Sequence, residues 1–462
     1  MPANTSEPIA HDEPGTRKER VAWYAYDWGN QPFVTTVMTV LGTVYLTRLA
    51  GTAAGCDPDE DACGDTRVSL LWLDVPIESL WAYTVSASVF ATVIAMPIVG
   101  AMADRAESKR RLLGLFAFGG AAMIFAFVFF GADGGDYQAA VGLILGANIL
   151  YSCSMVVYNS FLPQLARSED RDRMSSLGWA FGYLAGGSFL AFNLVCLEIA
   201  KAVDVDQLTV VQYSIASTGL WWTGWTMFTL ARLRDRPPAA AVDSGSGVWS
   251  GGFRQLGRTL KELRGYPYTL LFLAAFLLYS DGISAVIALA ATYGDQELGL
   301  DAGTLVLTIL IVQFVNFVGA LSLKALATVV GAKRTVLLGL IGWTGVVLAA
   351  WWLPENNAGA FLGLGVALGI VMGGTQALSR SLFSQLIPKG REAAYFGIYQ
   401  IADRGTSWIA PLMFGVVVSV TGSMRTGIIG LLVFFVVGFA LLAMVPIRRA
   451  IVAAGNTPPH KV

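Results

Sequence analysis

Among the ionisable residues inside long apolar segments of this 462-residue sequence, where a charged side chain is costly, four are the main candidates for function. Asp27 lies near the start of the first such segment and Asp281 midway along the seventh, whereas Arg380 and Arg404 lie within the tenth and eleventh. A charge at the centre of a membrane costs at least about 2.5–3.5 kcal/mol, so such residues are usually paired or functional. We therefore interpret these four residues as candidates for binding a charged solute or carrying a coupling ion.

We expect Asp281, Arg380 and Arg404 at similar depth in the membrane, because their distances from the inner ends of their helices differ by roughly one to two helical turns. We predict that Asp281 pairs with Arg380 or Arg404 in the empty protein, and that protonation of Asp281 frees the arginine for a substrate carboxylate. Asp27 is surrounded in sequence by aromatic residues (Trp23, Tyr24, Tyr26 and Trp28), which indicate a belt at the membrane interface. For Asp27, a structural and a functional role both stay open.

Uncharged polar residues add to the candidate site. Amides occur within spans at Asn148, Gln313, Asn316, Gln376 and Gln400, where they either join helices by hydrogen bonds or face a cavity. The only histidines, His11 and His460, lie in the tails, so we expect no histidine metal or haem ligand in the membrane. The phosphate-binding pattern Gly-x-x-x-x-Gly-Lys-Ser/Thr is absent, and we expect no cofactor.

The elements that carry these residues are predicted to be membrane helices. The sequence is 55% hydrophobic and 14% charged, whereas a soluble protein carries roughly 25% charged residues. Twelve segments are long enough to span a bilayer, which takes about 20 residues: 23–48, 79–103, 110–131, 138–163, 174–200, 210–231, 268–293, 304–326, 334–353, 359–387, 393–420 and 425–447. The predicted fold class is an all-α membrane protein with twelve transmembrane helices.

A basic stretch, residues 232–267, divides the spans into two sets of six. The predicted organisation is an N-terminal tail (1–22), an N-terminal six-helix bundle (23–231), a connector (232–267), a C-terminal six-helix bundle (268–447) and a C-terminal tail (448–462). Phe253, Leu256, Leu260 and Leu263 recur at helical spacing within the connector, which predicts a short amphipathic helix on the membrane surface.

The two halves repeat each other. Phe161–Leu165 aligns with Leu382–Leu386 at the end of the fourth helix of each half. Such a repeat predicts two six-helix pseudo-repeats related by an axis along the membrane normal, with a site enclosed between them. Glycines at four-residue spacing, such as Gly178, Gly182 and Gly186, predict close helix packing.

Charge distribution predicts the orientation. Of the 31 cationic residues, only Arg48, Arg67, Lys201 and Arg425 fall in the odd-numbered connections, and Arg380 and Arg404 lie within spans. The positive-inside rule then predicts a multi-pass protein of the plasma or inner membrane with both termini cytoplasmic. Cys56 and Cys63 flank an acidic run in the first external loop and are candidates for a disulfide, although two free thiols stay open.

The stretch from Gly100 to Arg111, with Asp104-Arg105 and a basic cluster, resembles the signature loop of the major facilitator superfamily, although Glu107 and Ser108 replace the Gly and Arg of that signature. Further motifs resemble the vacuole-effluxer branch, whose fungal members are autophagy-related amino-acid exporters. These motifs are Trp23–Asn30, Tyr158–Pro163 with Asn159, Tyr279–Gly282 and Gln376–Phe383. The resemblance covers about residues 20 to 447.

The resemblance implies a gate and a function. Gly100, Asp104 and Arg105 would form the gate, with Asp104 docking near Gly390–Ala394 at the start of the eleventh span while the cytoplasmic side is closed. We predict that the protein is not an enzyme but a secondary transporter that works by alternating access. Its expected substrate is a small polar organic solute, most simply an amino acid. We expect it to export this solute, and protons could drive the export. The expected partners are this solute, membrane lipids and protons, with no nucleic acid, and the expected state is a monomer.

Three alternatives define what else the sequence could encode. A drug or sugar exporter of the same fold is the nearest. An intramembrane aspartyl protease, with Asp27 and Asp281 as its carboxylates, lacks the required Gly-x-Gly-Asp, because Tyr279-Ser280 precedes Asp281. A receptor or scaffold would carry large soluble domains, for which the sequence leaves no room.

Overall fold

The computed structural model describes residues 14–56, 66–70, 73–129, 137–236, 257–405 and 407–461. Helices dominate these residues, and each of the twelve predicted segments coincides with one helical stretch. In the N-terminal half the elements are α1 (Arg17–Pro32), η1 (Phe33–Leu41), α2 (Gly42–Ala54), β1 (Arg67–Leu70), β2 (Leu73–Pro76), η2 (Ile77–Ser79), α3 (Leu80–Arg105), α4 (Lys109–Phe125), η3 (Ala126–Phe129), α5 (Tyr137–Ser160), α6 (Leu162–Leu165), α7 (Arg171–Ala202) and α8 (Gln207–Arg232).

The C-terminal half begins after the connector. Its elements are α10 (Pro267–Thr292), η4 (Tyr293–Glu297), α11 (Ala302–Val330), α12 (Ala332–Trp351), α13 (Ala358–Gln385), α14 (Glu392–Gln400), η5 (Ile401–Gly405), α15 (Ile409–Thr421), α16 (Met424–Gly430), α17 (Leu432–Met444) and α18 (Ile447–Ala453). Among the described residues, ten helices are long and apolar enough to cross a membrane. The other two predicted spans are the 26-residue α8, which carries several serines and threonines, and the interrupted stretch α14–η5–α15.

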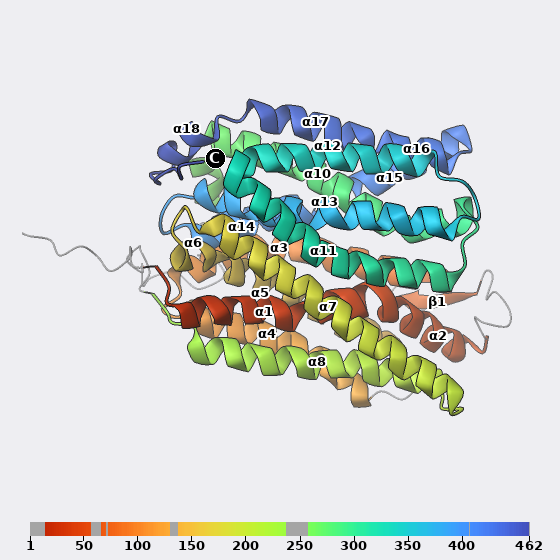
Figure 1. Ribbon diagram of the computed structural model, residues 1–462. Coiled ribbons are helices and arrows are strands. Elements are labelled where there is room, and N and C mark those ends of the chain that lie inside the picture. Colours follow the sequence, from red (N-terminus) through yellow and green to blue (C-terminus); the bar gives the residue numbers. More distant parts are fainter. Residues whose placement is uncertain are drawn as a thin grey trace, which may run out of the picture.

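The helices run side by side along one long axis, with the N-terminal half and the C-terminal half forming the two sides of the molecule (Figure 1). Each half has its own apolar core. Trp23, Tyr158 and Trp222 belong to one core, and Phe276 and Trp343 belong to the other. The protein is therefore an all-α membrane protein of two six-helix halves.

The two ends of the bundle differ in character. We call the end that holds Arg17, Arg105, Arg232 and Arg448 the basic end. The opposite end carries a short antiparallel hairpin, β1–β2, in which Val68 faces Val75, and we call it the hairpin end (Figure 1). This hairpin was not predicted, because its two four-residue strands lie in the connection between the first two spans, where the apolar residues are too few to span a membrane.

Two carboxylates start helices at the hairpin end. Asp206 accepts hydrogen bonds from the hydroxyl and backbone N–H of Thr209 at the start of α8, and Asp301 does the same with Thr304 at the start of α11. These hydrogen bonds, above all those from the threonine hydroxyls, hold the pKa of both carboxyls below the ordinary aspartate value.

The predicted glycine strips lie at close helix contacts. A Cβ on Gly186 of α7 would lie 2.7 Å from Cγ2 of Thr35, and one on Gly373 of α13 would lie 2.4 Å from the backbone oxygen of Asn316 in α11. These contacts confirm that the glycines allow neighbouring helices to approach closely.

Two predictions fall wholly or partly outside the described residues. The Cys56–Cys63 pairing does so because residues 57–65 are not described, and it stays a prediction. Of the predicted amphipathic helix, Phe253 and Leu256 also lie outside, whereas residues 257–263 are helical. Leu263 packs into the C-terminal core and Leu260 is exposed, so the described part docks on the bundle through one turn.

Candidate functional site

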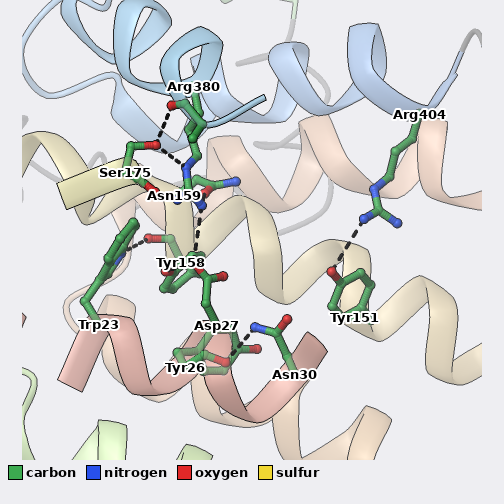
Figure 2. A network of polar contacts seen from close by, with 11 residues as sticks. Trp23, Tyr26, Asp27, Asn30, Tyr151, Tyr158, Asn159, Ser175, Arg380 and Arg404 are labelled. Atoms are coloured by element: carbon green, nitrogen blue, oxygen red, sulfur yellow. Dashed lines mark hydrogen bonds and ion pairs between the residues drawn. The ribbon is translucent and has the colours of Figure 1, made fainter. Parts of the chain in front are cut away.

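A buried ion pair joins the two halves of the bundle. Oδ2 of Asp27 in α1 lies 3.6 Å from Nη1 of Arg380 in α13, and both side chains are at least nine-tenths buried. The hydroxyl of Tyr158 in α5 donates a 2.7 Å hydrogen bond to the same carboxylate oxygen. The pair lies at the meeting point of α1, α5, α7 and α13 (Figure 2).

Aromatic rings enclose the pair on the N-terminal side. Trp23 stacks on Tyr158 with ring centroids 4.5 Å apart, and its indole N–H donates to the backbone oxygen of Tyr158. Trp23 and Tyr26 are completely buried, so the predicted interfacial belt is wrong for these two residues. The physical reason is that one face of α1 turns inward, where the aromatic rings pack around Asp27.

A glycine makes room for this arrangement. A Cβ on Gly178 of α7 would lie 2.6 Å from Oδ2 of Asp27 and 2.7 Å from Cζ3 of Trp23. Any side chain at this position would displace the ion pair or the indole ring. The site therefore requires a glycine at position 178.

Arg380 is held by the N-terminal half through three groups. Nε donates to Oγ of Ser175 and Nη2 donates to the backbone oxygen of Ser175, both at 2.9 Å. Nη1 also donates to Oδ1 of Asn159 at 3.3 Å. A guanidinium with its donors occupied in this way fixes α13 against α5 and α7 at this depth.

Asp281 forms no ion pair with an arginine in the part of the chain that the structure describes, and the predicted pairing with Arg380 or Arg404 is wrong. Its Oδ2 accepts a 2.9 Å hydrogen bond from the backbone N–H of Ala410, in the first turn of α15. The side chain is buried and its Oδ1 has no hydrogen-bond partner among the described residues. Because a helix N-terminus attracts a carboxylate, the broken eleventh span supplies the charge compensation that we expected from an arginine.

Arg404 lies apart from the ion pair and belongs to the turn of π-helix η5 (Figure 2). Its guanidinium lies 5.0 Å from the ring centroid of Tyr151 and donates a 3.5 Å hydrogen bond to the hydroxyl of that residue. The preceding Asp403 accepts a 2.8 Å hydrogen bond from Ser280 of α10. Both charges of η5 line the central cavity described next.

A cavity of about 630 Å³ lies between the halves. It extends from Arg404 and Gln376 toward the hairpin end, where Trp81 and Tyr293 line it. The amides Asn148, Gln313, Asn316 and Gln376 line it as well, and Gln400 lines a small space that adjoins it beside Asp27. The five amides therefore face a cavity, and Asn148 and Gln376 also join helices, because Asn148 donates a hydrogen bond to Ser88 and Gln376 accepts one from Tyr183.

Several polar atoms of this cavity have no hydrogen-bond partner among the described residues. They are Nε1 of Trp179, Oε1 of Gln313, Oδ1 of Asn316 and Nε of Arg404. A buried polar atom without a partner costs about 1–3 kcal/mol, so the cavity is suited to a polar ligand that satisfies donors and acceptors together.

At the basic end the halves meet in a tight contact. The carboxylate of Asp104, near the end of α3, accepts 2.8 Å hydrogen bonds from the backbone N–H groups of Ala393 and Ala394 in the first turn of α14. Lys109 lies 3.3 Å from Asp104 and 3.6 Å from Glu392. The predicted contact of Asp104 with the start of the eleventh span is present, and its role in gating stays a prediction.

Backbone contacts tighten this closure. A Cβ on Gly100 would lie 2.4 Å from the backbone oxygen of Ala393. Arg105 is the last residue of α3. On the other side of the bundle, Arg171 of α7 donates a 2.8 Å hydrogen bond to the backbone oxygen of Ser384 in α13, and Ser175 donates to that of Ala377. Two helix pairs, α3–α14 and α7–α13, thus close the basic end.

The structure brings together only some of the predicted site residues. Asp27, Asn159 and Arg380 meet, Gln376 and Arg404 line the cavity, and Asn30 donates to the backbone oxygen of Tyr26 within its own helix. Sequence reasoning did not select Asp403, Ser175, Trp179 and Tyr183 as site residues. Asp403 lies inside the eleventh apolar segment, so it carried the same signal as Arg404, whereas the other three carry no distinguishing signal in one sequence.

Two six-helix halves around a central cavity are the architecture of major facilitator superfamily transporters. The solved structures similar to this chain have that fold. They include the proton:xylose symporter XylE (TM-score 0.64, 12% identity, 93% of this chain and 95% of that chain covered) and the outward conformation of the transporter FucP (TM-score 0.61, 14%, 92% and 99%). At such identities the likeness shows the fold alone.

Residues 15–455 match the family described as "Vacuole effluxer Atg22 like", and the chain belongs to this family. Similar curated relatives are the uncharacterized MFS-type transporter YxiO of Bacillus subtilis (26% identical, 93% of this chain and 95% of the relative covered) and autophagy-related protein 22-1 of Aspergillus niger (24%, 94% and 89%). The chain is therefore a secondary transporter and not an enzyme, which sets aside the protease alternative.

Proposed function

We propose that this transporter exports a zwitterionic solute, an amino acid, across the plasma or inner membrane. The observation that carries the proposal is the pair of opposite charges, Asp403 and Arg404, that η5 presents to one end of the central cavity. A guanidinium suits a carboxylate and a carboxylate suits an ammonium group, so adjacent charges of both signs match the two charges of an amino acid.

The remaining lining supports a small polar solute. Trp179, Tyr183 and Tyr151 supply ring surfaces near the two charges, and Gln313 and Asn316 supply acceptor oxygens without partners among the described residues. Apolar side chains such as Val85, Ile287 and Leu305 form much of the remaining wall and would also suit a drug, so the polar atoms without partners are what favour a small polar solute. A sugar would use the amides and rings but would leave Arg404 and Asp403 without charged partners.

The closed basic end bears on the side to which the cavity opens and on the route of the solute. By the positive-inside rule this end faces the cytoplasm, so the structure corresponds to a state that opens outward. For export, the solute would enter while the contacts of Asp104 and Arg171 at the basic end are broken, and would leave through the hairpin end once they have formed.

Asp27 supports coupling to protons. The pair formed by Asp27 and Arg380 joins α1 to α13, so it exists only while the basic end is closed. When the halves separate at this end, Asp27 loses the compensating charge, and binding a proton is the simplest way to neutralise a buried carboxylate. The site adjoins the cavity through Gln31 and Trp179, so the charge of Asp27 and the bound solute can influence each other.

Ligand-induced stabilisation of the purified protein tests the substrate class. A ligand that binds only the folded state raises the unfolding temperature by an amount that grows with its concentration relative to its dissociation constant. We expect a rise with a neutral amino acid, and none with the matching amine that lacks the carboxylate or the matching acid that lacks the amino group. Arg404→Gln should abolish the rise. Stabilisation by a sugar, with none by any of twenty amino acids, would overturn the proposal.

A further inference from the structure

A second pocket at the basic end lies outside the transport site, on the outer side of the C-terminal half. It has a volume of about 710 Å³ and lies between the start of α12, the link after α17, and α18. Five basic residues line it, namely Lys333, Arg334, Arg448, Arg449 and Lys461, and no carboxylate does so among the described residues.

The cations of this pocket form no ion pair with any described residue. Lys333 donates to the backbone oxygens of Ala443 and Val445, and Lys461 donates to that of Thr328. Arg448 likewise contacts only backbone oxygens, those of Pro459 and His460. Like charges gathered in one pocket repel one another, so a bound anion would stabilise this arrangement.

The walls of the pocket are apolar. Val329, Leu337 and Val445 line it beside the cations. Exposed apolar side chains continue from it along α12 and α17 toward the middle of the membrane, including Leu338, Ile341 and Met444. The pocket lies where two membrane-spanning helices end, which is the level of lipid headgroups.

From this juxtaposition we infer that the pocket binds an anionic glycerophospholipid. Its phosphate lies among Arg334, Arg448 and Arg449, and its acyl chains lie along the apolar faces of α12 and α17. Arginine and lysine donors match phosphate oxygens, and a soluble phosphate would leave the apolar walls unused. The lipid would pin α18 and the C-terminal tail to the start of α12.

Native mass spectrometry of the purified full chain tests this inference. Phosphatidylglycerol and phosphatidylcholine are titrated separately, and the bound lipids are counted. We expect one tightly bound phosphatidylglycerol and no comparable phosphatidylcholine. Each cation near an anionic lipid contributes about fivefold to affinity, so the double variant Arg334→Gln, Arg449→Gln should weaken binding more than tenfold.

A matched control removes two arginines from the same end of the N-terminal half. Arg111 and Arg234 are exposed and lie outside the pocket, and changing both to glutamine should alter the affinity less than twofold. An equal loss of phosphatidylglycerol affinity in both double variants would show that the lipid responds only to general surface charge, and would overturn the proposed site. Displacement of the lipid by an equal concentration of glycerol phosphate would show a soluble-anion site, and equal binding of both lipids would show no headgroup recognition; either result overturns the inference.

Discussion

At the scale of residues, the ion pair between Asp27 and Arg380 is the feature that calls for a functional explanation. A buried ion pair seldom stabilises a fold more than apolar residues of the same volume, because two charges must lose their hydration. This pair also joins the two halves of a transporter at the end that must open. We therefore interpret it as a contact that forms and breaks during the transport cycle.

Asp27→Asn tests that interpretation. The amide can still hydrogen-bond Tyr158 and Arg380 but cannot carry a proton, so we expect solute accumulation driven by a pH gradient to be lost while exchange of solute is kept. The measurement is uptake by proteoliposomes with and without an imposed gradient. Asp281→Asn is the matched control and should accumulate solute like the unaltered protein. Full accumulation by Asp27→Asn would assign coupling to another residue.

Gly178→Ala tests how tightly the site is packed. The new methyl carbon would lie 2.6 Å from the carboxylate of Asp27 and 2.7 Å from the buried ring of Trp23. Overpacking of this kind typically costs about 1–3 kcal/mol, so the unfolding temperature should fall. Gly142→Ala in α5, where no atom lies within 4 Å, should leave it unchanged or raise it. Equal unfolding temperatures for the two variants would contradict the close packing of Gly178 against Asp27 and Trp23.

At the scale of elements, the contact of α3 with α14 should set the balance between the two states of the transporter. Asp104→Asn removes the charge that binds the N-terminus of α14. A carboxylate there contributes about 0.3–1 kcal/mol, and up to about 2 kcal/mol when partly buried. We expect the population open at the basic end to rise, as measured by alkylation of a cysteine placed at Ser384. Glu107→Gln, an exposed change in the same connection, should not raise it, and equal alkylation in all three proteins would count against the gate.

The break in the eleventh span gives Asp281 a different role from the predicted one. Asp281→Ala should remove the acceptor for Ala410 and destabilise the protein by about 0.5–2 kcal/mol, as the loss of a helix cap does. Asp281→Asn keeps an accepting oxygen and should retain most of the stability. Thermal unfolding measures both. An equal loss in the two variants would show that α15 requires the charge and not the hydrogen bond.

The membrane helices could be predicted well from the sequence, but the partners of the buried charged side chains could not. The twelve spans and the contact of Asp104 follow from local hydropathy and a short motif, so they could be found without a structure. The partners of Asp27, Asp281 and Arg380 depend on how each helix is rotated and on where the eleventh span breaks. The π-helices η1 and η5 insert residues without a periodic signal, and η5 is what turns Asp403 and Arg404 to one cavity.

At the scale of the whole molecule, the two halves close the basic end and leave a cavity that reaches the hairpin end. The contacts of Asp104 and Arg171 both run between helices of opposite halves, so the basic end can open only if the halves move relative to each other. The same movement would separate Asp27 from Arg380. We therefore expect one rigid-body change to link the proposed gate, the ion pair and access to the cavity.

Counterflow in proteoliposomes tests the central claim, that this cavity carries an amino acid across the membrane. Vesicles loaded with a millimolar unlabelled neutral amino acid receive a trace of the same labelled compound outside, with no ion gradient. The account predicts a transient overshoot of label with the unaltered protein, none with empty vesicles and a strongly reduced one with Arg404→Gln. No overshoot with any amino acid, together with overshoot of a labelled sugar or organic anion, would contradict it.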